Sequence, residues 1–186
     1  MTFRDGDILL TYGKGGFWPP RRMVLWLTYR AIRAYQKKKW LLDWRATHCR
    51  VYLDGRFFEA TTPVCRWTKL SELALDKKEW RVALWRETLD TAAMLDVAER
   101  LIGTPYDKGD LIDLGLAGLV GWFTKHVRIF GDRAKKYRVC STAAAEILHA
   151  GGARLFWRGK PLPPDETDPA AFENQPADLW QVLEAE

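Results

Sequence analysis

The segment of residues 46–60 restricts the fold of this chain more than any other. Residues 46–53 alternate in side-chain character and are rich in β-forming residues, which is typical of a half-buried strand. The pair Asp54-Gly55 that follows favours a tight hairpin turn. Residues 56–60 then supply a returning strand, so the sequence predicts an antiparallel hairpin here.

The length of the turn decides which side chains share one face of this hairpin. If two residues form the turn, Leu53 pairs with Arg56, and Glu59 lies opposite Arg50. Since strand faces alternate, Glu59 is then on the same face as His48, within diagonal reach of it. This register is a hypothesis, because a slip of one residue would turn Glu59 to the other face.

Strands and helices are expected on both sides of the hairpin. The expected strands are residues 7–12, 64–67, 79–85 and 155–157, and the expected helices are residues 21–38, 91–102, 110–130 and 141–150. Shorter helical turns are expected at residues 70–75 and 178–183. These elements predict an α+β fold, a small antiparallel sheet or barrel packed against helices.

The length of 186 residues and the apolar content of 47% fit a single domain over residues 1–186. Residues 108–138 are expected to form a helical insertion. We leave open whether it is a lid, an acyl-chain groove or a helix that only completes the core. Residues 160–186 begin with a stretch rich in Pro, Asp and Glu, which predicts a C-terminal tail at the surface.

The N-terminal residues and the cysteines predict a cytoplasmic protein. The first seven residues are charged and contain no apolar signal region. The longest mostly apolar stretch, residues 111–123, is much shorter than the ~20 residues of a membrane span. The three cysteines, Cys49, Cys65 and Cys140, form no CxxC pair, which favours reduced thiols.

Residues 14–39 carry eight lysines and arginines, and no acidic residue lies between Asp7 and Asp43. A basic face of this kind attracts anionic polymers or an anionic membrane surface, but a solvated helix face without a special partner is the favoured interpretation. No motif with a known nucleic-acid reading geometry is present, so no specific nucleic acid is expected as a partner. The oligomeric state is left open.

Cys140 immediately precedes the alanine-rich run expected to be a helix at residues 141–150. The first turn of a helix carries unpaired N–H groups and the positive end of the helix dipole, which favour a thiolate. An imidazole such as that of His48 would make this thiolate one half of a nucleophile pair. The alternative is a buried cysteine that only packs in the core.

Short sequence blocks resemble the NlpC-like cysteine peptidases, which are relatives of papain. The blocks are Gly6-Asp7-Ile8, His48 with the strand after it, Phe57-Phe58-Glu59-Ala60, Gly103-Thr104-Pro105-Tyr106 and Val139-Cys140-Ser141. In the common members the cysteine precedes the histidine, whereas here His48 precedes Cys140. The chain therefore resembles the circularly permuted branch of YiiX-like amidases, which is related to lecithin retinol acyltransferase.

The resemblance implies a permuted papain-like fold and covalent catalysis without a cofactor. It implies that Cys140 is the nucleophile and that His48 is the general base and later the acid. It implies that Glu59 orients His48, in place of the second histidine of the lecithin retinol acyltransferase pattern. Tyr106 and the backbone N–H of Cys140 would stabilise the oxyanion. A metal site at His48, Cys49 and Cys65 is not expected, because the first two side chains point to opposite strand faces.

The expected function is thiol-dependent hydrolysis or acyl transfer at an amide or ester bond, through an acyl-enzyme on Cys140. The substrate is expected to be a small molecule, a peptide such as a peptidoglycan or isopeptide fragment, or a lipid acyl group. A non-catalytic module with the same fold that binds lipid or peptidoglycan fragments is the alternative. A third possibility is a basic adaptor that acts through residues 14–39. His149 is nine residues beyond Cys140 on the same expected helix, too far away to exchange a proton with it.

Overall fold

The computed structural model describes residues 2–12, 46–73, 80–106 and 139–184. The expected helices at residues 21–38 and 110–130 lie outside the described residues, as does the basic stretch 14–39. Within the described ranges, no helix has the length and apolar character needed to cross a membrane.

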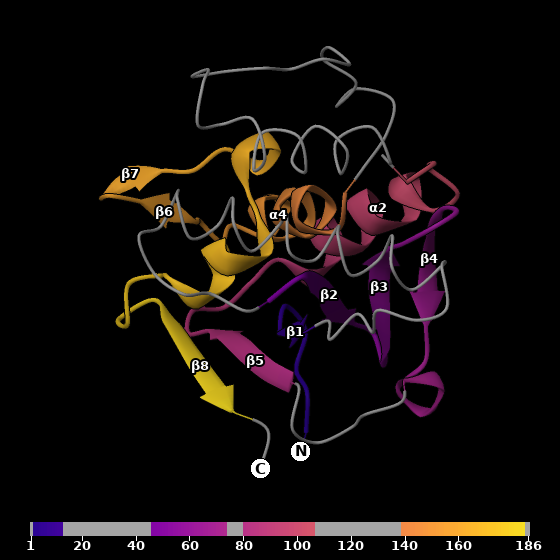
Figure 1. Cartoon of the computed structure of the whole chain (residues 1–186), viewed down its shortest axis with the longest axis horizontal. Helices are drawn as coiled ribbons and strands as arrows, with labels where there is room; N and C mark the ends of the chain where they lie inside the picture. The colour runs from indigo at the N-terminus through magenta and orange to yellow at the C-terminus, as the bar shows by residue number, and fades with distance from the viewer. Residues whose placement is uncertain (1, 13–45, 74–79, 107–138, 185–186) are drawn as a thin grey trace, which may run out of the picture.

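A mostly antiparallel sheet of six strands forms the centre of the molecule, in the order β4-β3-β2-β1-β5-β8 (Figure 1). Its strands are β1 (Ile8–Thr11), β2 (His48–Leu53), β3 (Arg56–Ala60), β4 (Cys65–Thr68), β5 (Trp80–Trp85) and β8 (Trp180–Glu184). A two-stranded sheet of β6 (Phe156–Trp157) and β7 (Lys160–Pro161) lies beside it, and a short 3₁₀ turn, η1 (Leu70–Glu72), follows β4. The sheet and the helices confirm the expected α+β class.

The hairpin of β2 and β3 has the register expected from a two-residue turn. Leu53 pairs with Arg56, and Val51 pairs with Phe58. Asp54 and Gly55 both have positive φ, at 48° and 77°, as both central residues of a type I′ turn require. The prediction of this hairpin is therefore confirmed, including its pairing.

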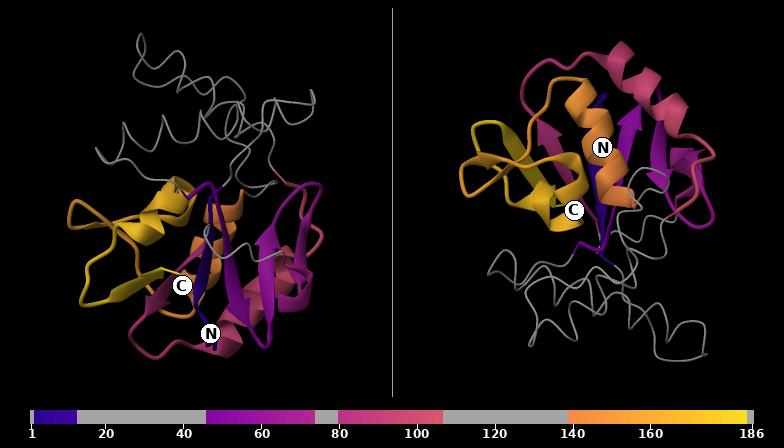
Figure 2. Two further views of the ribbon diagram at one scale, coloured as in Figure 1. Left: turned by 60° about the horizontal axis from the view of Figure 1, so that its bottom comes forward. Right: turned by 90° about the horizontal axis from the view of Figure 1, so that it is seen from above.

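Two helices, α2 (Thr91–Leu101) and α4 (Cys140–Ala150), cover one face of the sheet (Figure 2). Asp90 caps α2, since its carboxylate accepts the backbone N–H of Ala93 at 3.0 Å. The buried side chains of α4 include three consecutive alanines, Ala143 to Ala145, which allow the helix axis to approach the strands closely. This close approach brings the first residue of α4 to the strands beneath it.

Both faces of the sheet are at least partly buried. Alternate strand residues such as Ile8, Val51 and Ala83 pack in one cluster with the helices. The residues between them, such as Leu9 and Val82, form a smaller cluster on the opposite face.

The C-terminal segment differs from expectation. The expected short helix at residues 178–183 is wrong, because these residues lead into and form most of β8, which pairs with β5. Trp180 pairs with Trp85, and their rings meet edge to face with centroids 5.2 Å apart. Pairing with the sheet and burial of an indole outweigh the weak local helical pattern.

The segment expected as a surface tail also contributes to the core. It contains two 3₁₀ turns, η3 (Pro164–Glu166) and η4 (Pro169–Glu173). Phe172 in η4 is fully buried and packs against Trp180. The richness in proline and acidic residues describes the exposed positions of this segment but not its buried ones.

The first glycine of the chain provides a test of packing at the N-terminus. Gly6 has φ 93°, and a Cβ added there would overlap Leu89 Cδ1, whereas Gly103 has φ 78° with nothing near a new Cβ. We expect Gly103→Ala to lower the free energy of unfolding by about 1–2 kcal/mol through backbone strain. Gly6→Ala should lose the same amount and about 1–3 kcal/mol more through overpacking. Urea unfolding of both variants measures the difference, and equal losses would contradict it.

Candidate active site

Cys140 is the first residue of α4, as its sequence context predicts. Val139 precedes it in an extended conformation and supplies no side-chain cap, so the N–H groups of the first turn have no capping side chain. The Cys140 side chain is 6% exposed. Ser141 Oγ donates a 2.7 Å hydrogen bond to the carbonyl oxygen of Thr167, which fixes the start of the helix against the segment before η4.

His48, the first residue of β2, forms a side-chain hydrogen bond with Cys140. Burial of the ring lowers the pKa of His48. The negative charge of Cys140 and the hydrogen bonds with Cys140 and Glu59 raise it by more, so the net pKa of His48 is above its ordinary value. The environment therefore favours a protonated imidazole when the thiolate is present.

The pKa of the Cys140 thiol is well below that of a free cysteine. The largest cause is a hydrogen bond with the Cys49 side chain; burial opposes it, and the charge and hydrogen bond of His48 add to it. A lowered thiol pKa beside a raised imidazole pKa describes a thiolate–imidazolium pair.

Glu59 on β3 is 2% exposed and accepts from four side chains on two other strands. His48 Nε2 lies 3.5 Å from Glu59 Oε2, and Arg50 Nε lies 2.6 Å from the same oxygen. Glu59 Oε1 accepts hydrogen bonds from Arg66 Nη2 at 2.8 Å and Thr68 Oγ1 at 2.9 Å. Burial raises the pKa of Glu59, but the hydrogen bond with His48, the charge of Arg50 and the bonds from Arg66 and Thr68 hold it well below the usual range.

The Glu59 contacts determine how the ring of His48 is presented. Because Nε2 is directed to Glu59, Nδ1 is the ring nitrogen left for Cys140. The expected diagonal reach from Glu59 to His48 is confirmed, and so is its contact with Arg50. The Glu59 side chain is buried in the sheet and does not face solvent.

Sequence reasoning missed Arg66 and Thr68 as partners of Glu59. Arg66 pairs directly with Glu59 across β3 and β4, and its side chain is 58% exposed. Arg66 could have been predicted as a partner of Glu59 only from its position opposite Glu59 on the next strand. That position depends on the register between β3 and β4, which the residues of the intervening turn do not specify by themselves.

Cys49 also contacts Cys140. Its thiol forms a hydrogen bond with Cys140, and its backbone forms another with the Cys140 sulfur. Burial alternates along β2, as expected if the His48 and Cys49 side chains point to opposite faces. Both side chains nevertheless contact Cys140, which lies near the first residues of this strand. Across the part of the chain described, no group of three or more His, Cys, Asp and Glu side chains is placed to hold a metal ion.

Tyr106 lies in the segment that follows α2 and is the last residue of the described range 80–106. Its backbone N–H donates to Pro63 at 3.0 Å, next to a bridge between Val64 and Pro105. Its half-buried ring packs against the main core cluster. The role of its hydroxyl at an oxyanion stays a prediction.

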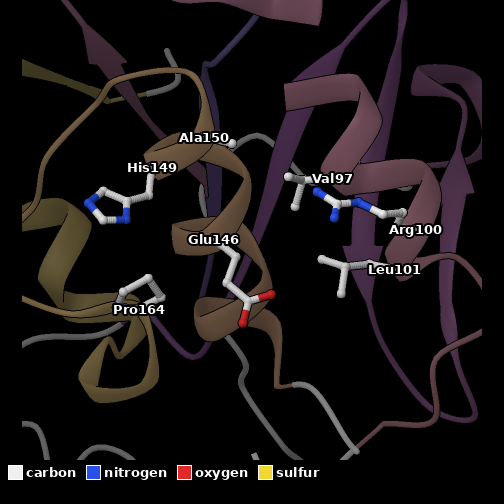
Figure 3. Close-up of a pocket in the computed structure, with 7 residues that line it drawn as sticks. All are labelled: Val97, Arg100, Leu101, Glu146, His149, Ala150 and Pro164. Carbon is white, nitrogen blue, oxygen red and sulfur yellow. The ribbon is translucent and has the colours of Figure 1, made fainter. Parts of the chain in front are cut away.

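A groove of about 500 Å³ lies between α2 and α4 (Figure 3). It is lined by Val97, Arg100, Leu101, Glu146, His149, Ala150 and Pro164. His149 lines this groove near the C-terminal end of α4, and burial followed by the charge of Arg154 lowers its pKa. None of the four predicted catalytic side chains lines the groove.

Comparisons with known proteins find a similar fold but assign the chain to no family. No family model matches the chain, and no curated protein matches its sequence. Among solved structures, the chain is similar to one described as metalloprotein yiiX from Escherichia coli O157:H7, DUF1105. The TM-score is 0.57 with 16% sequence identity, over 98% of this chain and 97% of the other. At 16% sequence identity, this likeness shows a similar fold alone.

The buried charge of Glu59 predicts a pH-dependent stability difference. Its folded pKa is lower than its unfolded value, so its charge stabilises the fold above about pH 4.5. This contribution is lost as the pH falls toward the folded pKa. At pH 7, Glu59→Gln should lower the free energy of unfolding by about 3–5 kcal/mol, because buried Arg50 loses its partner.

Unfolding of wild type and Glu59→Gln from pH 7 to pH 3 measures the difference between their free energies of unfolding. This difference should become smaller below about pH 4.5. Glu99→Gln is the matched control, because Glu99 pairs with Arg56 at 3.1 Å but is exposed; its loss should stay below about 1 kcal/mol. A gap that does not change with pH would contradict the role given to the Glu59 charge.

The thiolate–imidazolium pair predicts a titration that depends on His48. The ultraviolet absorbance of the thiolate should appear at a pH below that of a free cysteine, and Cys140→Ser should remove this step. His48→Gln should move its midpoint upward by about 1–3 units, since the positive partner is lost. Cys65→Ser should leave the midpoint in place. An unchanged midpoint in His48→Gln would show that the imidazole does not stabilise the thiolate.

Proposed function

We propose that this chain is a thiol-dependent hydrolase or acyltransferase that acts on an amide or ester bond through an acyl-enzyme on Cys140. The observation that supports the proposal is the linked contact of three side chains from three elements. Cys140 hydrogen-bonds with His48, and His48 Nε2 lies 3.5 Å from Glu59. A nucleophile, a proton carrier and a group that orients the carrier are the parts that covalent catalysis needs.

In the first half-reaction the Cys140 thiolate attacks the carbonyl carbon of the substrate. The oxyanion that forms is stabilised by the positive end of α4 and the backbone N–H of Cys140. The Tyr106 hydroxyl is proposed as the second donor. The imidazolium of His48 gives its proton to the departing amine or alkoxide, which leaves the acyl group on sulfur and a neutral ring.

In the second half-reaction His48 acts as the base. It takes a proton from water, or from an acceptor alcohol or amine, as that molecule attacks the thioester. The collapse of the second tetrahedral intermediate releases the acid or the transferred product and restores the thiolate beside the imidazolium. Glu59 keeps the ring oriented throughout and favours its charged form.

The proposed fold is the permuted papain-like one, in which the strand carrying the histidine precedes the helix carrying the cysteine. The likeness to the yiiX structure supports this arrangement. That protein is described as a metalloprotein. The side chains described here include no group suited to a metal ion, so the residues do not fit one and the mechanism contains no metal step.

The substrate is proposed as an acyl compound, with peptides and lipids as the two classes to compare. Arg50 and Arg66 flank the carboxylate that orients His48, but both are engaged by Glu59. They therefore do not by themselves select an acidic substrate. The basic residues 14–39 and the proposed insertion 108–138 lie outside the described residues, and their contacts with a polymer, a membrane or a substrate stay predictions.

Acylation by an activated ester tests the proposed nucleophile. Incubation with p-nitrophenyl acetate should release one nitrophenolate per chain in a burst and add one acetyl group to Cys140, found by intact mass and peptide mapping. Cys140→Ser should abolish the adduct, and His48→Gln should slow its formation by about 10²–10⁴-fold. Cys65→Ser, the matched buried cysteine, should keep the wild-type burst.

Acetylation spread equally over Cys49, Cys65 and Cys140, or a burst that survives Cys140→Ser, would contradict the enzymatic proposal. Such a result would favour the non-catalytic binding module. If the burst occurs as expected, a panel of peptide amides and lipid esters assayed for product release identifies the substrate class.

A further inference from the structure

A second cysteine lies against the proposed nucleophile. Cys49 on β2 and Cys140 on α4 belong to the same buried cluster, and their thiols are joined by a hydrogen bond. The backbone of Cys49 forms another hydrogen bond with the Cys140 sulfur. The pairing of β2 with β3 runs from Leu53–Arg56 to Val51–Phe58 and stops before it reaches Cys49. The proton transfers proposed above do not need a second thiol.

The two cysteines differ in reactivity and access. Cys140 is 6% exposed and Cys49 is 1% exposed, so Cys140 is the more accessible of the two. The Cys140 pKa is lowered well below the ordinary value, whereas burial raises that of Cys49 well above it. Thiolate character and access decide which thiol a peroxide oxidises. We therefore expect a peroxide to oxidise Cys140 first, while Cys49 stays reduced beside it.

We propose that Cys49 is a resolving cysteine, which forms a reversible disulfide with Cys140 after a peroxide has oxidised Cys140. This inference goes beyond the proposed function, since it needs the two sulfurs and no substrate turnover. It assigns the pair as a modification site that switches the nucleophile off.

The proposed chemistry has two steps. The Cys140 thiolate attacks one oxygen of hydrogen peroxide; the S–O bond forms, the O–O bond breaks, and the hydroxide released takes a proton from the His48 imidazolium to become water. The Cys49 thiol then attacks the sulfur of the Cys140 sulfenic acid. The S–S bond forms, the S–O bond breaks, and the hydroxyl leaves with the thiol proton as a second water. Two thiols lose two electrons in total, and the peroxide gains them.

The third cysteine shows why the partner is Cys49. In the sheet, β3 lies between β2, which carries Cys49, and β4, where Cys65 pairs with Ala60 of β3. Cys65 is thus two strand spacings, about 10 Å, from β2, the strand whose first residues contact Cys140. Cys49 and Cys140 already share a hydrogen bond, so the two side chains that would form the disulfide are in contact.

Treatment of the full chain with a molar excess of hydrogen peroxide, followed by alkylation and non-reducing peptide mapping, tests the inference. We expect an intact mass lower by two hydrogens and a cross-linked peptide pair containing Cys49 and Cys140. Dithiothreitol should reverse it. In Cys49→Ser the cross-link should be absent and Cys140 should proceed to sulfinic acid, while Cys65→Ser should form the cross-link as wild type does. Circular dichroism checks that both variants are folded.

Sulfinic acid at Cys140 of the wild type without a cross-link, or a cross-link that involves Cys65, would overturn the inference. The p-nitrophenyl acetate burst separates this result from failure of the proposed function. A burst without a cross-link would contradict only the resolving role of Cys49. A cross-link without a burst would contradict only the proposal that the chain is a hydrolase. When both hold, the oxidised chain should show no burst until dithiothreitol is added.

Discussion

The packing of α4 against the sheet is the constraint on which the candidate site depends. Its alanine-rich buried surface lets the helix lie close to β2, and its first residue then meets the start of that strand. The hydrogen bond from Ser141 to Thr167 holds the same end of the helix from the other side. A cysteine at this point receives the helix dipole and an imidazole together, although the two residues are far apart in sequence.

The electrostatics of the site rest on one buried carboxylate. Glu59 is surrounded by the ring of His48, the guanidinium groups of Arg50 and Arg66 and the hydroxyl of Thr68. Such a network compensates the cost of burying a charge and leaves little freedom for the carboxylate to move. The orientation of His48 is thereby fixed by three strands of the sheet rather than by a loop.

Local patterns were sufficient to predict the parts of the structure that depend on near neighbours. The Asp54-Gly55 turn fixed the pairing of Leu53 with Arg56, and this pairing brought Glu59 to the side of Arg50 and His48. The helix start at Cys140 followed from the residues around it. Contacts between distant segments were not accessible in the same way. Arg66 depended on the register of a further strand, and the contact of Cys49 with Cys140 depended on how far α4 extends along β2.

The C-terminal segment shows the same limit. A weak helical pattern at residues 178–183 gave way to pairing with β5, because a sheet edge and two tryptophan rings were available to it only in the folded protein. Burial of Phe172 followed from the same long-range packing.

The position of β8 has a consequence for synthesis of the protein on the ribosome. The edge of β5 stays uncovered until residues 180–184 have been made, and the start of α4 lacks its Thr167 acceptor until shortly before that. A nascent chain can form the β2–β3 hairpin early, since all its contacts are local. The start of α4 gains its Thr167 acceptor, and β5 gains its second neighbour, only after translation has passed these late segments, so both are completed after the hairpin.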